Sequence, residues 1–473
     1  MTRGVVKYMA DTPVSLRYAG VAELSAALRS RAVTPTELAE EAIRLLDGVG
    51  SRYNAVASLL PDRAQHEAIV AERMLASGNA GALCGIPYAV KDLFAARGGP
   101  TTWGSAAFAN RYLGTDATVI RRLTAASSVL TAKLSMSEFA GGGRPAMPGA
   151  SMHGQGRNPW DPRRYSGGSS SGSGIAVACG LVPFALGTET GGSILGPAAF
   201  AGVTGLRPTY GVVPSKGVMT LSWTLDKPGP LSRSADDCAA VMEVIAPRSA
   251  TGKAFEEVVD DVLGSRRRIR VAFSEHELAE AAPNIRTALS AGIEAFRGIM
   301  PTFRNVELRR NPRFIEDLEE IVRIEGAYGL RAHLRDQEFQ MTDARQRATL
   351  TSGLDAPAVN YLEAVRSTIP LARASFAQVF READVILSAS RPTIAPRLDE
   401  VRPPRDATKM SDLLRAAGNL AGLPGVSMPC GLSDEGLPVG LQLIGPRGSD
   451  RLLLGIAAAF QRTTSFHRNR PPS

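Results

Sequence analysis

Residues 187–194 read Gly187-Thr188-Glu189-Thr190-Gly191-Gly192-Ser193-Ile194. The apolar run at 184–186 precedes this segment and predicts a strand, and a helical pattern begins at about Pro197. A strand therefore leads through a tight glycine turn into a helix. Successive glycines allow backbone N–H groups to turn toward one point, and such groups beside a serine form an oxyanion hole. The segment predicts Ser193 as a nucleophile.

A serine nucleophile needs a base, and the candidate is Lys91. It ends the segment Gly85-Ile86-Pro87-Tyr88-Ala89-Val90-Lys91-Asp92, whose apolar part at 88–90 predicts a strand. We therefore expect Lys91 at a buried strand end, where the loss of hydration lowers the pKa of a lysine until the neutral amine accepts a proton. The segment alone leaves two alternatives open, a surface lysine and a lysine paired with Asp92.

A second glycine- and serine-rich loop reads Gly167-Gly168-Ser169-Ser170-Ser171-Gly172-Ser173. It contains the GxSxG pattern of a nucleophile elbow, which requires a strand immediately before the serine. The residues that precede it, 158–162, have the composition of a loop, so we reject the elbow. No Gly-Lys-Ser/Thr follows, which argues against a phosphate cradle. By composition alone the segment is typical of a turn or a linker.

Short apolar runs alternate with helical patterns along the rest of the chain, which predicts an α/β fold. A capping box, Thr34-Pro35-Thr36-Glu37, opens the first clear helix, and Ser234 is expected to cap a later one. A turn at Gly436 predicts at least one antiparallel strand pair, and therefore a mixed sheet with helices on both faces. We expect helices at 34–48, 62–77, 117–126, 234–245 and 450–462, and strands at 88–90, 129–132, 184–186, 269–273, 385–387, 426–428 and 439–443.

The composition of the 473 residues argues against several classes of protein. Four distant cysteines and five histidines without ligand spacing predict neither a metal site nor a cofactor. The net charge is +8, but the only dense basic run is 266–270, which we interpret as a solvated strand edge, and 6% aromatic residues favour no nucleic-acid partner. No apolar run is long enough to span a membrane and residues 1–16 do not form a signal peptide, so we expect a cytoplasmic protein.

Three of these segments together resemble the amidase signature family: Gly85 to Asp92, Gly167 to Ser173 and Gly187 to Ile194. Ser193 follows Ser169 by 24 residues, as in the family pattern, and the resemblance extends from about residue 20 to 462. Further matches are Ser137-Glu138-Phe139-Ala140, Asn158-Pro159-Trp160-Asp161, Pro197-Ala198-Ala199-Phe200, Gly205-Leu206-Arg207-Pro208-Thr209-Tyr210-Gly211, Gly422-Leu423-Pro424 and Gly436-Leu437-Pro438-Val439-Gly440-Leu441-Gln442.

The resemblance implies a Ser–cis-Ser–Lys triad on the amidase signature fold, a central twisted mixed sheet covered by helices on both faces. By position, Ser193 attacks a carbonyl, Ser169 relays the proton from a cis bond to Gly168, and Lys91 is the final base. The oxyanion hole is then formed by the N–H groups of Thr190, Gly191, Gly192 and Ser193. Ser170 and Ser171 are expected to brace the loop.

The resemblance also implies that the chain forms one domain, 1–473. We divide it into a helical N-terminal layer (1–80), a catalytic core that holds the family motifs (85–245), a divergent substrate-shaping region (253–384) and a return to the sheet (385–465). Leu195 stands where the family usually has arginine after Gly-Gly-Ser-Ile. We place Met136, Phe139 and Leu195 in the substrate pocket, with plain core packing as the alternative.

The function expected from the sequence is hydrolysis of the C–N bond of a small-molecule amide through an acyl-enzyme on Ser193, with anilides, esters or carbamates (urethanes) as further candidate substrates. We expect a monomer or homodimer without metal or cofactor. The alternative is the glutaminase subunit of a tRNA-dependent amidotransferase, which requires partner subunits. A non-catalytic binding protein on the same fold is a third hypothesis, which the presence of all three triad residues disfavours.

Overall fold

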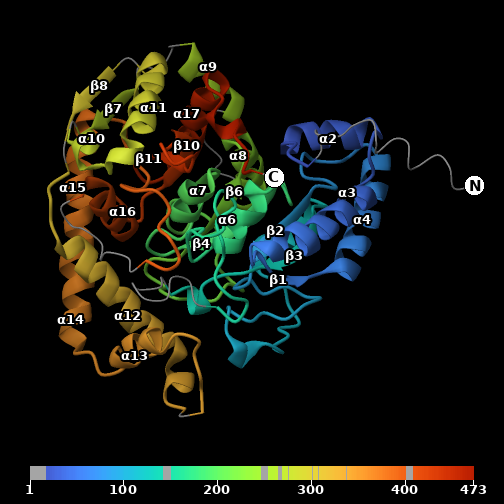
Figure 1. Cartoon of the computed structure of the whole chain (residues 1–473), viewed down its shortest axis with the longest axis horizontal. Coiled ribbons are helices and arrows are strands. Elements are labelled where there is room, and N and C mark those ends of the chain that lie inside the picture. Colours follow the sequence, from blue (N-terminus) through green and yellow to red (C-terminus); the bar gives the residue numbers. More distant parts are fainter. Residues whose placement is uncertain are drawn as a thin grey trace, which may run out of the picture.

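The computed structural model describes residues 17–141, 151–246, 254–264, 269–274, 276–300, 302–306, 308–336, 338–400 and 409–472. In this part of the chain, an 11-stranded sheet forms the centre of the molecule, in the order β1-β3-β2-β4-β6-β5-β10-β11-β9-β7-β8 (Figure 1). The strands are β1 (Val56–Leu59), β2 (Pro87–Lys91), β3 (Val129–Leu134), β4 (Phe184–Glu189), β5 (Thr204–Arg207), β6 (Lys227–Ser232), β7 (Arg270–Phe273), β8 (Thr302–Asn305), β9 (Val385–Ala389), β10 (Gly425–Leu432) and β11 (Pro438–Ile444).

The sheet is mixed, as predicted. β2 runs parallel to β3 and β4, and β7 runs parallel to β8 and β9. The remaining neighbours are antiparallel, including the pair β10–β11 that the turn at Gly436 joins. Because β7 and β8 lie within 253–384, this region adds strands to the same sheet. The four-part division of the chain stays a prediction.

Helices cover both faces of the sheet and extend beyond its edges. They are α2 (Val21–Arg29), α3 (Pro35–Leu45), α4 (Pro61–Ala76), α5 (Thr118–Ala125), α6 (Ser171–Ala178), α7 (Leu195–Ala201), α8 (Ala235–Ile245), α9 (Phe255–Leu263), α10 (Glu277–Glu280), α11 (Arg286–Ile299), α12 (Arg313–Leu334), α13 (Ala344–Ser352), α14 (Ala358–Glu363), α15 (Ile369–Glu382), α16 (Met410–Ala421) and α17 (Asp450–Thr463). Short 3-10 or π segments are η1 (Leu46–Gly50), η2 (Ala106–Phe108), η3 (Glu138–Ala140), η4 (Pro283–Ile285), η5 (Ala364–Thr368) and η6 (Phe466–Arg468).

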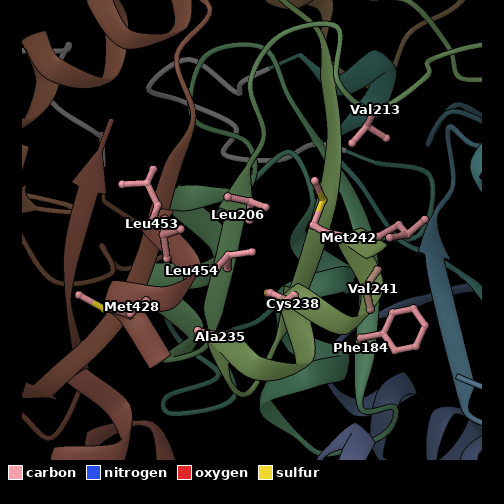
Figure 2. Close-up of a cluster of buried hydrophobic side chains, with 14 of the residues drawn as sticks. Phe184, Leu206, Val213, Ala235, Cys238, Val241, Met242, Met428, Leu453 and Leu454 are labelled. Atoms are coloured by element: carbon pink, nitrogen blue, oxygen red, sulfur yellow. The ribbon is translucent and has the colours of Figure 1, made fainter. Parts of the chain in front are cut away.

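Strand alternation separates the two faces of the sheet. On one face, Phe184 of β4 and Leu206 of β5 pack with side chains of α8 and α17, such as Val241 and Leu454 (Figure 2). On the other face, small residues such as Ala185 allow α6 and α7 to pack closely against the sheet. These two helices follow the two glycine loops, so the packing of the second face brings both loops to the sheet.

The predicted helix caps are confirmed. The Thr34 hydroxyl accepts a hydrogen bond from the Glu37 N–H at 3.2 Å, and the Glu37 carboxylate accepts from the Thr34 N–H at 2.8 Å. Ser234 accepts from the Asp237 N–H at 3.1 Å at the start of α8. These local hydrogen bonds satisfy amide groups that a helix start otherwise leaves unpaired, which is why the sequence marks the boundaries.

Four strands were not predicted: β1, β5, β6 and β8. β6 reads KPGPLS and contains two prolines, a composition typical of a turn. It becomes a strand because it pairs with β4 along six residues and with β5 on its other side. Residues 1–16, where we expect no signal peptide, and 266–268 of the basic run lie outside the described residues.

Candidate active site

Lys91 is the last residue of β2 and is completely buried. Its Nζ atom donates to the Ser169 hydroxyl at 2.7 Å and to the Thr188 hydroxyl at 3.0 Å. Burial lowers the pKa of Lys91 to about 7, although the negative charges of Asp226 and Glu189 act in the opposite direction. The alternative of an exposed lysine is wrong, because Lys91 is completely buried. The alternative of a Lys91–Asp92 pair is wrong, because Asp92 pairs with Lys133 at 2.6 Å.

The loop that carries Ser169 leads directly into α6. The peptide bond between Gly168 and Ser169 is cis, as the resemblance implies. The Ser169 carbonyl accepts from the Ser137 N–H at 3.2 Å. The Ser170 hydroxyl donates to the Thr188 carbonyl at 3.2 Å, and the Ser171 hydroxyl donates to the Ser135 carbonyl at 3.4 Å. Ser170 and Ser171 therefore attach the loop to its neighbours, which is the bracing geometry expected of them.

The loop that carries Ser193 folds around the carboxylate of Glu189. One carboxylate oxygen accepts from the N–H groups of Ile194 and Leu195, both at 2.9 Å. The other accepts from Arg207 at 3.1 Å and from Asn419 at 3.0 Å. Burial alone raises the pKa of Glu189, but Arg207 and these N–H groups outweigh it and lower this pKa to about 2. The carboxylate therefore stays charged and holds the turn closed.

The sequence did not identify Glu189, Arg207 and Asn419 as a group. Glu189 lies in the glycine motif, and Arg207 lies in another segment that matches the family. Their opposite charges were the signal in the sequence that could have predicted this ion pair. Asn419 follows more than 200 residues later, and only the fold brings its amide to the carboxylate.

The two loops lie against each other. Gly167 has φ +88°, and a Cβ there would come within 2.6 Å of the Pro197 Cα, so only glycine allows this approach. The Ser193 side chain is partly exposed, and among the described residues its hydroxyl has no hydrogen-bond partner. The Lys91–Ser169 half of the predicted triad is thus in hydrogen-bonding contact, and the Ser169–Ser193 link stays a prediction.

The predicted oxyanion-hole residues form the turn before α7. The Thr190 hydroxyl donates to Asp226 at 2.6 Å, which fixes the start of the turn. Within the described ranges, the N–H groups of Gly192 and Ser193 donate to no protein acceptor. They are therefore free to donate to an anionic oxygen, and the assignment of all four N–H groups to the hole stays a prediction.

The three residues placed in the substrate pocket are buried. Met136 and Leu195 are each 1% exposed, and Phe139 packs its ring against Trp103 and Phe108. This is the core packing that the sequence left open as the alternative, and the role of these residues toward a substrate stays a prediction. A cavity of about 150 Å³ lies elsewhere and includes Thr188, the residue whose hydroxyl accepts from Lys91. It is lined by Thr188, Tyr210, Gly211, Val213, Ser215, Val218, Met219, Thr220, Trp223, Asp226 and Pro228.

The divergent region 253–384 contacts the rim of this cavity. Glu325 of α12 is buried and accepts from the Ser222 hydroxyl at 2.5 Å and from the Thr224 N–H at 3.1 Å. Between these two residues, the Trp223 ring meets the Tyr328 ring of α12 edge to face at 5.6 Å. α12 therefore holds the turn that supplies Trp223 to the cavity.

The part of the chain that the structure describes contains no group of three or more His, Cys, Asp or Glu side chains placed to hold a metal ion. The four cysteines are buried free thiols. Over the same residues, no helix combines the length and the apolar character needed to cross a membrane.

Comparisons with known proteins agree with this geometry. A family model described as Amidase matches residues 37–454. The A subunit of the glutamyl-tRNA(Gln) amidotransferase of Thioalkalivibrio sulfidiphilus is 35% identical over 480 residues, which cover 95% of this chain and 98% of the relative. The protein of the same name from Chloroflexus aurantiacus is also 35% identical and covers 96% of this chain and 99% of its own. The native peptide amidase from Stenotrophomonas maltophilia is 28% identical, with a TM-score of 0.80 and coverage of 98% of both chains.

Proposed function

This chain belongs to the amidase signature family, and on that premise we propose that it hydrolyses the C–N bond of an amide through an acyl-enzyme on Ser193. The observation that carries the proposal is the environment of Lys91. Its amine is fully buried, contacts the Ser169 hydroxyl at 2.7 Å and has a pKa of about 7. A lysine that loses its proton near neutral pH is suited to act as a general base.

In the proposed acylation step, the Ser193 hydroxyl oxygen attacks the carbonyl carbon of the amide. Its proton passes to the Ser169 oxygen as the Ser169 proton passes to the neutral Lys91 amine. The negative charge that develops on the carbonyl oxygen is received by N–H groups of the 190–193 turn. The tetrahedral intermediate then expels the amine, which takes the relayed proton, and the acyl group remains on Ser193.

In the proposed deacylation step, the same groups activate a water molecule. The water oxygen attacks the acyl carbonyl, and its proton travels through Ser169 to Lys91. Collapse of the second intermediate returns a proton to the Ser193 oxygen and releases a carboxylic acid. Each cycle thus consumes one water and one amide and leaves the residues unchanged.

Two substrate classes fit this chemistry. The first is a free small-molecule amide, with anilides, esters or carbamates as further candidates. The 28% identical peptide amidase supports this class, as do the apolar and aromatic walls of the cavity, including Tyr210, Met219 and Trp223. For this class, we propose a cytoplasmic monomer or homodimer.

The second candidate is the side-chain amide of glutamine, with the chain acting as the glutaminase subunit of a tRNA-dependent amidotransferase. The curated relatives favour this candidate over the first, because two glutamyl-tRNA(Gln) amidotransferase proteins are 35% identical to this chain over nearly their whole length. This function requires partner subunits that use the released ammonia. The same acyl-enzyme chemistry on Ser193 serves both candidates.

The test compares wild type and Ser193→Ala on matched substrates: L-glutamine and a peptide amide, with ammonia as the readout, and three 4-nitroanilide-type compounds, with 4-nitroaniline as the readout. The three are an acetanilide, an aryl-acyl anilide and an alkyl carbamate of the same amine. We expect wild type to cleave at least one and Ser193→Ala to cleave none. Turnover by Ser193→Ala at the wild-type rate would refute the acyl-enzyme. Glutamine as the best substrate, with copurifying subunits, would select the second candidate.

A further inference from the structure

Two arginines from distant parts of the chain contact the turn that carries Ser193. Arg391 follows β9, and its Nη2 atom donates to the Gly192 carbonyl at 3.2 Å. Arg415 lies on α16, and its Nη1 atom donates to the Gly191 carbonyl at 3.4 Å. The two carbonyls belong to the peptide units that also contain the N–H groups of Gly192 and Ser193.

Both arginines lie on the same side of the turn. A Cβ built on Gly192 would come within 2.7 Å of the Arg415 Cδ and 3.1 Å of the Arg391 Nη2. A Cβ on Gly196 would come within 2.1 Å of the Arg391 Nη2, so the missing side chain at this position makes room for the guanidinium. The Gly192 carbonyl also accepts from the Gly196 N–H at 2.9 Å, which fixes its direction further.

The orientation of these carbonyls decides where the N–H groups point. A trans peptide unit is planar, and its C=O and N–H bonds point in opposite directions. Because the carbonyls of Gly191 and Gly192 point toward the arginines, the N–H groups of Gly192 and Ser193 point to the opposite side. There, among the described residues, they donate to no protein acceptor.

Each guanidinium group has a further neighbour besides the turn. The Arg415 side chain is 7% exposed and pairs with Asp412 at 2.5 Å, one turn earlier on α16. The Arg391 guanidinium lies 5.8 Å from the centre of the Phe200 ring of α7. Leu195 occupies the position where the family usually has arginine, and in this chain cationic contacts to the turn come from the segment after β9 and from α16.

We propose that Arg391 and Arg415 are positioning residues that aim the N–H groups of Gly192 and Ser193 at the oxyanion of the tetrahedral intermediate. This inference rests on the proposed function. It assigns the arginines no contact with the substrate, so their loss should lower kcat and leave KM nearly unchanged.

The experiment compares Arg391→Met and Arg391→Lys with wild type on the best anilide of the set above. Diisopropyl fluorophosphate, which labels an active serine, gives the concentration of competent sites. The inhibitor 1,1,1-trifluoro-4-phenylbutan-2-one, which forms a hemiketal oxyanion with a serine, probes the hole directly. The matched control is Arg397→Met, which removes a partly exposed arginine of the same segment that pairs with Asp399 at 3.0 Å.

Loss of one oxyanion donor costs about 10²–10³ in rate, and a misdirected donor should cost less, about tenfold or more. We therefore expect Arg391→Met to lower kcat per labelled site about tenfold, to change KM less than about threefold and to raise the Ki of the ketone in parallel. Arg391→Lys should recover part of the loss, and Arg397→Met should match wild type.

An unchanged kcat per labelled site in Arg391→Met would overturn the proposal, as would a loss confined to KM, which would indicate a substrate contact instead. If wild type itself is neither labelled nor active, the proposed function fails together with this inference. Labelled, active wild type beside an unaffected Arg391→Met refutes only the positioning role. Arg415→Met serves as a second variant, with unfolding followed in parallel because it removes the guanidinium group that pairs with the nearly buried Asp412.

Discussion

Two lysines on neighbouring strands have the same burial and opposite surroundings. Lys91 ends β2, where it pairs with Leu134 of β3, and Lys133 pairs with Val90 one position earlier; both lysine side chains are completely buried. Lys133 contacts the Asp92 carboxylate at 2.6 Å and the Thr101 hydroxyl at 3.0 Å. Lys91 contacts two hydroxyl groups, of Ser169 and Thr188.

The difference shows that the partner of a buried lysine, more than its burial, decides what the lysine can do. Burial lowers the pKa of both amines. For Lys133, the adjacent Asp92 opposes the shift and compensates the ammonium charge, so the pair holds the end of β2 to β3. For Lys91, no carboxylate of the described residues lies in contact, and the amine can exchange its proton near neutral pH. Strand alternation produces this division, because Lys133 pairs with Val90 whereas Lys91 pairs with Leu134, so the two lysines lie on opposite faces of the sheet.

The largest expected effect is the loss of activity in Lys91→Met. General-base transfer contributes about 10²–10⁴ in rate, so we expect kcat to fall about 10³-fold with the fold retained. At pH 6 the variant should unfold at a higher denaturant concentration than wild type, because it no longer buries an ammonium group. Steady-state kinetics and urea unfolding measure both. Near-normal turnover by Lys91→Met would show that Lys91 is not the base, and the two buried lysines would then not differ in function.

Lys133→Met should have the opposite effect: it should lower stability and leave kcat nearly unchanged. Removing one partner of a buried pair costs about 3–5 kcal/mol, because the carboxylate of Asp92 stays buried without its cation. We expect a lower urea midpoint and, in the molecules that remain folded, a kcat within a few-fold of wild type. A large loss of kcat per diisopropyl fluorophosphate-labelled site, with stability unchanged, would show that Lys133 also takes part in the chemistry.

The pH dependence should follow Lys91. Its neutral form is the proposed base, so kcat/KM should rise about tenfold per pH unit below a pKa of about 7 and level off above it. Between about pH 7 and 10.5, Lys91 is protonated in the unfolded chain and neutral in the folded chain. Because the unfolded state binds the extra proton, the contribution of Lys91 to the free energy of unfolding rises with pH over that range. A rate–pH profile, with Lys133→Met as the control, tests the assignment. A flat profile for acylation would contradict it.

The smallest effect is expected for Thr188→Val. The substitution keeps the shape of the side chain and removes the hydroxyl that accepts from Lys91 at 3.0 Å. A single hydrogen bond contributes about 0.5–1.5 kcal/mol, so kcat should fall between about twofold and tenfold. Single-turnover kinetics on the best anilide measure the change. A loss as large as that of Lys91→Met would mean that Thr188, and not Ser169, relays the proton.

Much of the fold could be predicted because its signals are local. Thr34 and Ser234 mark helix starts by hydrogen bonds within a few residues, and the apolar run before Lys91 marks a buried strand. β6 could not be predicted in this way. Its prolines, Pro228 and Pro230, disfavour a strand locally, and the pairing with β4 and β5 overrides that preference.

The sequence by itself determined which three residues we propose for the chemistry: Lys91 and Ser193 from their own segments, and Ser169 from the resemblance to the family. Only the tertiary structure decided what surrounds them. It gave Asp92 to Lys133 and left Lys91 with hydroxyl groups, and it brought Arg391 and Arg415 to the turn before Ser193. The physical reason is range. A motif records the contacts of neighbours in the chain, whereas burial, pKa and the direction of an N–H group depend on side chains that lie from 41 to 224 residues away in the sequence.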